Sequence, residues 1–474
     1  MKIVIDMQGA QTDSRYRGIG RYTISLVQAL VRNRGQHDIV LVLNGLFEET
    51  LDPIQKAFNN ILPSENIVVW SAPGPVGIHD PENQGWHEIA AILREAFIAS
   101  LSPDVVLISS FFEGYIDNAV TSLRQFDVAT PVCVIAYDFI PLLNPTQYLD
   151  PHPGYSSFYR RKVQEISQSD IFLAISESSR QEAIDHLGIA PSKATNISAA
   201  CESFFKPIQI ESTQSQALMA KWGLTKPFIL YTGGADERKN LPQLIKAFAH
   251  LPQETKNSYQ ILFAGKLSTS QQSDLRRTAK KHGLADQALQ FTGFLTDEEL
   301  VMAYNLCQLF VFPSWHEGFG LPILEAMACG APTIAGNTSS LPEVVGWSEA
   351  LFDPHQQVSI TQMMHRSLTD QSFRAQLINH ARTQAQKFTW ETSACKALEA
   401  ISALLASQGK ARVKCSETQS SLVKTQALLV QALAHALQKH KLLADTDIDY
   451  LAACMAQNEQ QIHLHTSPKL INSA

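Results

Sequence analysis

The 474-residue sequence predicts an α/β protein with two similar halves, each a parallel sheet covered by helices. Short apolar runs alternate with amphipathic helical segments along both halves, which is the pattern of parallel sheets with helices on both faces. A polar stretch ending at a proline separates the halves at 205–227. With 45% hydrophobic and 18% charged residues, the chain is long enough for two or three buried cores.

The first half contains apolar runs that we expect to form the buried strands of one sheet. Between these runs, the segments 22–32 and 86–98 carry apolar residues at helical spacing, so they are expected to cover the sheet. The predicted strands are 3–6, 39–43, 67–70, 105–109, 132–137 and 171–175.

A second set of apolar runs follows the polar stretch and predicts a second sheet. Its first strand leads into a glycine-rich turn and then into an amphipathic helix at 241–250. The predicted strands are 228–233, 259–265, 289–292, 309–312 and 332–335.

The C-terminal part of the sequence is helical in pattern. One helix begins at Thr389 and runs to about Ser407, 408–414 is polar and basic, and 421–443 is rich in alanine, leucine and glutamine. We expect this tail to be a solvated helix or a disordered end. The alternatives are a helix that pairs with a second copy or lies on a membrane surface.

Charge and cysteine content exclude several classes of protein. A net charge of −7 and a pI near 6.1 provide no global basic field for nonspecific nucleic-acid binding. The seven cysteines are scattered without a C-x-x-C pair, so we expect reduced thiols and a cytoplasmic protein rather than disulfides or a structural metal. The N-terminal apolar run is too short for a signal peptide, and no run reaches the 18 or so apolar residues of a membrane span.

The stretch 314–330 places Glu317 in a glycine-rich loop and Glu325 in a short helix eight positions later. Gly318 and Gly320 allow a close approach of the backbone to a ligand, and a helix N-terminus favours an anion such as a diphosphate. Carboxylates accept hydroxyl hydrogen bonds, which is how sugars and riboses are commonly bound. The spacing alone is equally compatible with an ordinary loop before a buried helix.

A second glycine-rich turn, 232–240, contains Gly233 and Gly234 and then the cations Arg238 and Lys239. These two charges can neutralise a departing diphosphate without a metal ion. Cations at the start of a helix oppose its dipole, so an anion is expected nearby, although such a pair is often a solvated surface feature.

Three further segments are weaker candidates. Gly18 and Gly20 lie in an expected loop between the first strand and the first helix, where they bind a ligand or make a tight turn. Asp138 ends an apolar strand, where it either contacts a ligand or caps the end of the strand. The segment 337–343 offers backbone N–H groups to an anion or caps a helix.

The string 314–330, preceded by the Arg238–Lys239 pair, resembles the signature of retaining glycosyltransferases of family 4. The resemblance implies the GT-B fold, with two Rossmann-like domains facing an interdomain cleft, plus a C-terminal helical extension. The implied division is an N-terminal Rossmann-like acceptor domain at 1–205, a nucleotide-sugar domain at 206–388, a crossover helix at 389–408 and a helical or partly disordered extension at 409–474.

The resemblance also implies roles for individual residues. Glu317 is expected to face the donor sugar, while Arg238 and Lys239 stabilise the leaving diphosphate, and Asp138 is a further catalytic candidate. Many relatives have a histidine where this chain has Tyr137, so that histidine's contact to the donor sugar is not carried over. The expected substrate-binding residues are Glu325, Gly18, Gly20, Gly233, Gly234, Gly318, Phe319, Gly320, Ser339, Ser340 and Leu341.

We therefore expect a metal-independent, retaining glycosyltransferase that moves a hexose from a nucleotide sugar, GDP-mannose by preference, to a glycan or lipid-linked acceptor. The Tyr-Asp pair before Ile-Pro-Leu is similar to a subgroup of mannosyl- and rhamnosyltransferases of bacterial surface polysaccharides, including lipopolysaccharide. Donors based on UDP or dTDP, GDP-rhamnose, and a noncatalytic glycan- or nucleotide-binding protein are the alternatives. A nicotinamide oxidoreductase is disfavoured because the complete G-x-G-x-x-G pattern is missing.

The same interpretation predicts the partners. We expect a nucleotide sugar and an acceptor, no metal ion and no nucleic acid. The expected location is the cytoplasm or the inner face of the membrane, with peripheral membrane attachment and oligomerisation through the C-terminal helix left open.

Overall fold

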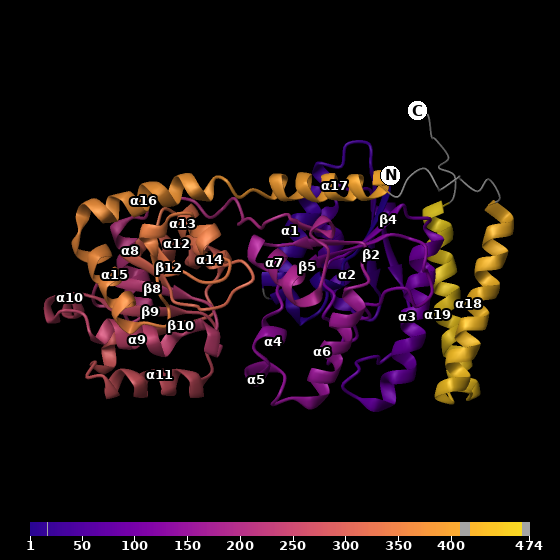
Figure 1. Ribbon diagram of the computed structural model, residues 1–474, viewed down its shortest axis with the longest axis horizontal. Coiled ribbons are helices and arrows are strands. Elements are labelled where there is room, and N and C mark those ends of the chain that lie inside the picture. Colours follow the sequence, from indigo (N-terminus) through magenta and orange to yellow (C-terminus); the bar gives the residue numbers. More distant parts are fainter. Residues whose placement is uncertain (17, 408–417, 467–474) are drawn as a thin grey trace. The chain divides into compact units, whose positions relative to one another are not determined.

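The computed structural model describes residues 1–16, 18–407 and 418–466, which divide into two compact units (Figure 1). Unit 1 comprises Met1–Ile175, Ser179–Ile197 and the described residues from Trp390 onward, and unit 2 comprises Ser176–Ser178 and Ser198–Thr389. Each unit contains one parallel sheet, as the apolar runs predict. Arg17 and the predicted basic stretch 408–414 lie outside the described residues.

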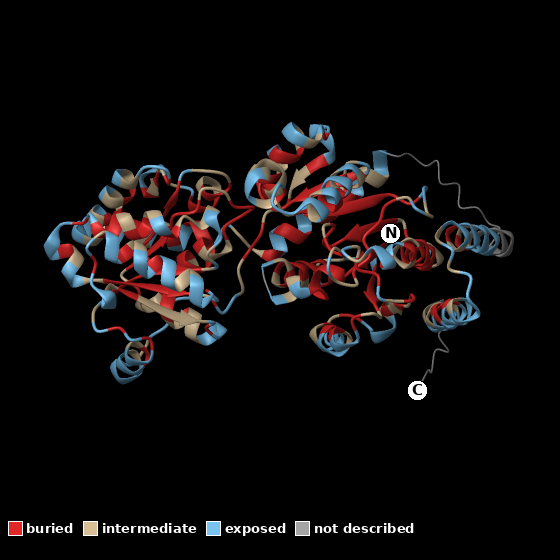
Figure 2. Cartoon of the chain, turned by 90° about the horizontal axis from the view of Figure 1, so that it is seen from below, coloured by how far each residue is buried: buried red, intermediate tan, exposed pale blue. Residues whose placement is uncertain are grey.

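Unit 1 has a seven-stranded parallel sheet with the order β3-β2-β1-β4-β5-β6-β7. Its apolar strand residues are buried, and the strands are red in Figure 2. All six strands predicted in the first half are present, but β7 was not among them because its sequence, Ala-Thr-Asn, is no apolar run. The strands are β1 (Lys2–Asp6), β2 (Asp38–Asn44), β3 (Ile67–Trp70), β4 (Val105–Ile108), β5 (Val132–Ala136), β6 (Ile171–Ala174) and β7 (Ala194–Asn196).

The first helix of unit 1, α1 (Gly18–Arg32), begins earlier than the predicted residue 22. Gly18 and Gly20 therefore lie in a helix, and their expected place in a loop is wrong. A Cβ added to Gly20 would lie 2.2 Å from the Cα of Arg15, so glycine is what allows the first turn of α1 to pack on the preceding 3-10 helix. The other helices before the unit boundary are α2 (Glu48–Phe58), α3 (Gln84–Ser100), α4 (Ile140–Leu143), α5 (Pro145–Tyr148), α6 (Pro153–Ile166) and α7 (Glu177–Leu187), with 3-10 helices at Gln8–Ala10, Asp13–Tyr16, Ser64–Asn66, Pro81–Asn83 and Pro191–Lys193.

The chain returns to unit 1 after unit 2. Helix α17 (Trp390–Ser407) packs against α1, and the Trp390 ring contacts the edge of Tyr22 with ring centroids 5.1 Å apart. Helices α18 (Thr418–His440) and α19 (Asp445–Thr466) both pack against α3, and α19 also packs against β3 (Figure 1, yellow).

The C-terminal extension is helical, as expected, but α18 and α19 are not simply solvated helices. Leu433, Ala436 and Leu451 are buried in the same hydrophobic core as strands β2 to β6. Cys454, one turn after Leu451, is buried as well. These residues recur at helical spacing, so one face of each helix is apolar and packs on unit 1.

Unit 2 has a six-stranded parallel sheet with the order β10-β9-β8-β11-β12-β13. Its five predicted strands are present, and the two-residue β13 is too short to predict from an apolar run. The strands are β8 (Phe228–Thr232), β9 (Gln260–Ala264), β10 (Leu289–Gly293), β11 (Leu309–Phe312), β12 (Thr333–Gly336) and β13 (Leu351–Phe352).

The stretch 205–227, predicted as a linker, lies inside unit 2 and contains a helix, α8 (Ser212–Lys221). Leu218 and Trp222 are buried, and the Trp222 ring meets Phe228 edge to face, which ties this polar segment to the sheet. The remaining helices of unit 2 are α9 (Leu241–Ala249), α10 (Gln253–Ser258), α11 (Thr269–Lys281), α12 (Asp297–Leu306), α13 (Leu321–Ala328), α14 (Leu341–Val345), α15 (Gln357–Thr369) and α16 (Gln371–Ala385), with 3-10 helices at Glu237–Lys239, Asp286–Ala288 and Ser348–Ala350.

Across the described residues, no helix has both the length and the apolar character that a bilayer crossing requires.

Candidate functional site

The strongest predicted residues of unit 2 lie at one edge of its sheet. Three loops leave the carboxyl ends of neighbouring strands: 233–240 follows β8, 313–320 follows β11 and 337–340 follows β12. In open parallel sheets this edge is where ligands bind. The sheet order therefore brings Arg238, Lys239 and Glu317 together although they lie far apart in sequence.

Glu317 forms ion pairs with both predicted cations. Its Oε2 lies 2.6 Å from Nη1 of Arg238, and its Oε1 accepts a hydrogen bond from Nζ of Lys239 at 2.6 Å. The sequence predicts each of these charges separately, but it does not predict that the carboxylate binds both cations. The three side chains together carry one net positive charge, which suits an anionic ligand.

The surroundings keep Glu317 ionised. Burial would raise its pKa, but the nearby charges of Lys239 and Arg238 outweigh burial and lower the pKa to about 2. Burial lowers the pKa of Lys239, and the attraction of Glu317 opposes that shift. Glu317 is only 7% exposed, so these charges interact in a medium that screens them weakly.

Backbone hydrogen bonds fix the loop that carries Glu317. Its N–H donates to Oγ of Ser339 at 3.0 Å, and the Ser340 hydroxyl donates to the carbonyls of Glu317 and Phe319 at 3.0 and 2.8 Å. The Ser340 side chain is fully buried. The hydroxyls of Ser339 and Ser340 thus hold the Glu317 loop in place. The prediction for the segment 337–343 was instead that its backbone N–H groups bind an anion or cap a helix.

Three glycines at this edge of the unit 2 sheet have positive φ angles, which residues other than glycine rarely adopt. Gly320 (φ 105°) comes directly before α13, and Gly233 (φ 132°) follows β8. Gly265 (φ 151°), which the sequence analysis did not select, faces Gly233 so closely that a Cβ would lie 2.1 Å from the Gly233 carbonyl oxygen. Gly234 lies in the loop after β8, and Gly318 lies in the loop after β11.

Asn240 is a second residue that the sequence analysis missed. It has a left-handed conformation with φ 59° at the start of α9. Its Nδ2 donates to the carbonyls of Pro313 and Pro354 at 3.2 and 2.7 Å. Asparagine tolerates this conformation better than most residues, and here it connects the loops after β8 and β11. The available signal was an asparagine directly after the cations and before an amphipathic helix.

Glu325 lies in α13 and is 8% exposed. Its Oε2 accepts a hydrogen bond from the Tyr304 hydroxyl at 2.9 Å, and Tyr304 in turn lies 2.9 Å from Oγ1 of Thr232. Tyr304 was not among the predicted residues, because a tyrosine inside a helix with buried positions is usually an ordinary core residue.

The predicted residues of unit 1 lie at the carboxyl ends of its strands. Asp138 follows β5, and its Oδ1 accepts the N–H of Ile140, the first residue of the short helix α4, at 3.2 Å. Tyr137 points toward α1: its hydroxyl lies 3.2 Å from Oγ1 of Thr23 and donates to the Ser109 carbonyl at 3.1 Å. The tyrosine that stands in place of the histidine is therefore half-buried and tied by its hydroxyl to α1 and to the end of β4.

Glu113 is an acidic residue of unit 1 that the sequence analysis missed. It follows β4 and accepts hydroxyl hydrogen bonds from Thr12, Ser14 and Ser110 at 3.0, 3.0 and 2.9 Å. Burial raises the pKa of Glu113, and burial together with the charges of Asp138 and Glu113 raises the pKa of Tyr155 to about 12. The signal was the same that selected Asp138: an acidic residue shortly after an apolar strand.

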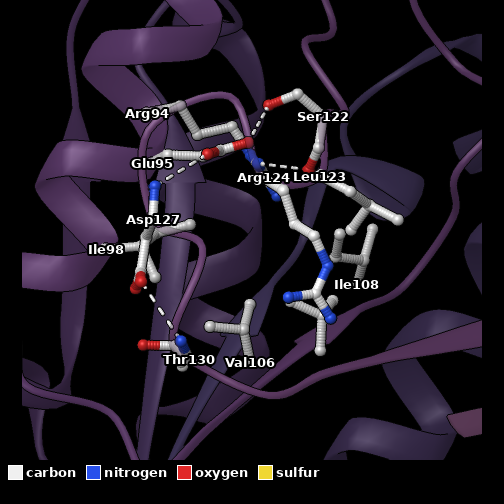
Figure 3. Close-up of a pocket in the computed structure, with 11 residues that line it drawn as sticks. Arg94, Glu95, Ile98, Val106, Ile108, Ser122, Leu123, Arg124, Asp127 and Thr130 are labelled. Atoms are coloured by element: carbon white, nitrogen blue, oxygen red, sulfur yellow. Dashed lines mark hydrogen bonds between the residues drawn. The ribbon is translucent and has the colours of Figure 1, made fainter. Parts of the chain in front are cut away.

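A small pocket in unit 1 lies between α3 and strands β4 and β5, and none of the predicted site residues lines it (Figure 3). Its polar lining includes Arg94 and Glu95, and Glu95 accepts the Ser122 hydroxyl at 2.7 Å. Nε of Arg94 donates to the buried Asp6 at 2.6 Å, and Asp6 also accepts the Gln8 N–H at 3.1 Å. These charges fix the chain where it leaves β1.

Comparison with known proteins identifies related sequences. Residues 215–384 match the family model described as Glycosyl transferases group 1. The chain is 37% identical over 464 residues to the Serotype-specific mannosyltransferase WbdA of Escherichia coli. The aligned region covers 98% of this chain and 54% of that protein. It is 31% identical over 256 residues to the O-antigen chain mannosyltransferase B of Escherichia coli, which covers 53% of this chain and 66% of that protein. The chain spans about half the length of WbdA.

Solved structures of the same fold include Anabaena Alr3699/HepE in complex with UDP and glucose, with a TM-score of 0.61 and 17% identity over 85% of this chain and 100% of that chain. WaaG, a glycosyltransferase involved in lipopolysaccharide biosynthesis, has a TM-score of 0.56 and 16% identity over 85% of this chain and 99% of that chain. At these identities the likeness shows the fold alone. The fold is GT-B, as the sequence resemblance implies.

Proposed function

From the premise that this chain belongs, through residues 215–384, to the group 1 glycosyltransferases, we propose that it is a retaining, metal-independent hexosyltransferase of bacterial surface polysaccharide synthesis. The observation that carries the proposal is the contact of Glu317 with both Arg238 and Lys239 at the carboxyl edge of the unit 2 sheet. This arrangement puts one acid that can bind sugar hydroxyls directly beside two cations that can bind a diphosphate.

The diphosphate of a nucleotide sugar would bind to Arg238 and Lys239. Arginine can hold two phosphate oxygens at once, and lysine adds a compact charge that the Phe312 ring flanks, with Nζ 5.2 Å from the ring centroid. As the bond between the sugar C1 and the phosphate oxygen breaks, negative charge grows on the diphosphate, and the two cations stabilise it. Protein charges therefore replace the divalent ion in this proposal.

Glu317 would accept hydroxyl hydrogen bonds from the donor hexose. Its pKa of about 2 ensures that it is a pure acceptor at neutral pH. An acceptor hydroxyl would then form the new bond to C1 on the same face, and its proton would pass to the departing phosphate oxygen. Attack on that face retains the configuration at C1 and needs no protein base.

Mannose is the proposed sugar, with GDP-mannose as the donor and Glu325 as the contact to the ribose hydroxyls. The support is the near full-chain identity of 37% to a protein named as a mannosyltransferase. The carboxylate of Glu325 lies in the same unit as the cation pair, in the middle of the helix that follows the Glu317 loop.

Unit 1 would bind the acceptor, a glycan or lipid-linked saccharide at the cytoplasmic face of the membrane. Glu113 and Asp138 follow strands β4 and β5, and Tyr155 lies in the first turn of α6. Burial, together with the charges of both acids, raises the pKa of Tyr155. Carboxylates and a tyrosine hydroxyl are suitable partners for sugar hydroxyls.

The test is transfer by the purified protein from GDP-mannose, UDP-glucose or dTDP-rhamnose to a mannose oligosaccharide, followed by mass spectrometry and by NMR of the new anomeric proton. We expect transfer from GDP-mannose, retained configuration and full rate in EDTA. Arg238→Ala and Glu317→Ala should each reduce kcat by about a hundredfold or more.

Arg277→Ala is the matched control, because Arg277 is an exposed arginine of unit 2. It should transfer at the parental rate. A rate that vanishes in EDTA and returns with magnesium, or parental rates for both site variants, would contradict the mechanism. Tight GDP-mannose binding with neither transfer nor hydrolysis would instead show a noncatalytic binding protein.

A further inference from the structure

A chain of buried hydroxyls links the end of β8 to the carboxylate of Glu325. Thr232 is the last residue of β8, Tyr304 lies in α12, and Glu325 lies in α13. The distances are 2.9 Å from Thr232 Oγ1 to the Tyr304 hydroxyl and 2.9 Å from that hydroxyl to Oε2 of Glu325. Their exposed fractions are 5%, 0% and 8%.

We propose that Tyr304 is a positioning residue that orients the Glu325 carboxylate toward the ribose of the bound nucleotide, so that the site distinguishes a ribonucleotide from a deoxyribonucleotide. This inference rests on the proposed function, because it assumes that unit 2 binds a nucleotide through Glu325. It goes further by naming the residue on which ribose recognition depends.

The direction of the hydrogen bonds follows from the chemistry of the groups. An ionised carboxylate only accepts, so the single proton of Tyr304 is donated to Glu325. The Thr232 hydroxyl must then donate to the Tyr304 oxygen. Successive hydrogen bonds of this kind polarise and strengthen one another in a buried setting.

Tyr304 remains a donor over the whole physiological pH range. Burial, followed by the charge of Glu325, raises the pKa of Tyr304 well above its usual value, so the phenol keeps its proton. The carboxylate therefore has a constant partner on Oε2, whatever ligand is present.

The ring of Tyr304 is held as firmly as its hydroxyl. Phe310 and Phe205 contact it edge to face, with ring centroids 5.5 and 6.0 Å apart. Removing the hydroxyl alone would leave this packing in place, because phenylalanine fills nearly the same space. Tyr304→Phe is thus a change in the hydrogen bond and not in the core.

The experiment measures nucleotide affinity by calorimetry with the full chain. GDP, 2′-deoxy-GDP and 3′-deoxy-GDP are titrated into the wild type and Tyr304→Phe, and UDP with its deoxy analogues is run in parallel. For the wild type we expect at least one deoxy analogue to bind about tenfold more weakly than the ribonucleotide, the loss of one hydrogen bond to a charged group.

For Tyr304→Phe we expect the ribonucleotide to bind about tenfold more weakly and the deoxy analogue to bind nearly as in the wild type. The ratio of the two Kd values should therefore fall toward one. Thr232→Val should shift the ratio in the same direction by a smaller factor. Glu325→Gln should reduce it as strongly as Tyr304→Phe.

Tyr259→Phe is the matched control, because Tyr259 is a half-buried tyrosine of unit 2 that lies just before β9. It should leave the ratio unchanged. If Tyr304→Phe weakened ribonucleotide and deoxy analogue equally, or neither, Tyr304 would be only a core residue and the inference would be wrong. If no nucleotide bound the wild type, the proposed function itself would fall.

Discussion

Glu317 is the counterion of two cations at once. Arg238 and Lys239 lie on opposite oxygens of its carboxylate, each at 2.6 Å. Two cations forced together in a buried site would repel each other without this carboxylate. The same residue that would bind the donor hexose therefore also keeps the cation pair stable before a donor arrives.

The stability of unit 2 should depend on pH through Glu317. Its folded pKa of about 2 lies below the ordinary 4.5, so its contribution is fully present above about pH 4.5 and is lost as the pH falls toward 2. At pH 7 we expect the free energy of unfolding of Glu317→Gln, measured by urea titration, to be lower than that of the wild type by on the order of 3 kcal/mol. This gap in free energy should shrink steadily below pH 4.5.

Glu349→Gln serves as the control for that titration. Glu349 pairs with Arg366 on the exposed surface of the same unit, where such pairs contribute little. Its gap to the wild type should be small and nearly flat from pH 7 to pH 2. A Glu317→Gln gap that did not change with pH would contradict the proposed ionisation.

Several candidate residues of the site could be selected from sequence, but their partners could not. Arg238, Lys239 and Glu317 belong to strings whose composition points to a diphosphate and a sugar. Their mutual ion pairs depend on the order of β8 and β11 in the sheet, which spacing does not give. Tyr304 could not be selected from sequence, because only the fold shows that its hydroxyl contacts Glu325.

At the scale of elements, α19 closes one edge of the unit 1 sheet with side chains. Oδ1 of Asn458 accepts the N–H of Ser71 at 2.7 Å, and its Nδ2 donates to the Ser71 carbonyl at 2.9 Å, directly after β3. Gln461 accepts the Val69 N–H at 3.4 Å. An edge strand that is covered in this way has fewer backbone groups open to another chain.

Asn458→Ala should destabilise unit 1 by about 1 kcal/mol, because it leaves the half-buried N–H and carbonyl of Ser71 without this partner. The measurement is the urea midpoint followed by circular dichroism. Gln460→Ala, an exposed change on the same helix, should leave the midpoint where it is. Equal midpoints for the two variants would show that the Asn458 contact does not stabilise the sheet edge.

Strands were predictable almost to the residue, because a strand buried on both faces must be a continuous apolar run. The runs at 67–70 and 309–312 coincide with β3 and β11. The short β7 and β13 contain too few apolar residues to be seen. The docking of α18 and α19 was also beyond prediction, because their partners in unit 1 are hundreds of residues away in the chain.

At the scale of the whole molecule, the two units differ in how they are encoded. Nearly all of unit 2 comes from one continuous segment, Ser198–Thr389, whereas unit 1 needs residues from both sides of it. The apolar faces of α17, α18 and α19 complete the core of unit 1.

A fragment of residues 198–389 should therefore fold alone and bind the same nucleotide as the full chain. Its thermal unfolding should be cooperative, and the nucleotide should raise the midpoint temperature. At a hundredfold excess over Kd the nucleotide should add about 2.7 kcal/mol to the free energy of unfolding. A fragment of residues 1–197 should show no comparable transition, since Tyr22 and its neighbours on α1 lose α17. A cooperative transition for residues 1–197 alone would contradict this dependence on the C-terminal helices.

The return of the chain to its first unit has a consequence during synthesis. On the ribosome an N-terminal domain usually folds as soon as it emerges. Here we expect the first 197 residues to complete their fold only after Trp390 and the helices after it have been translated, because until then the Tyr22 side of α1 is uncovered. The later-made unit is thus ready first, and the earlier-made one is completed last.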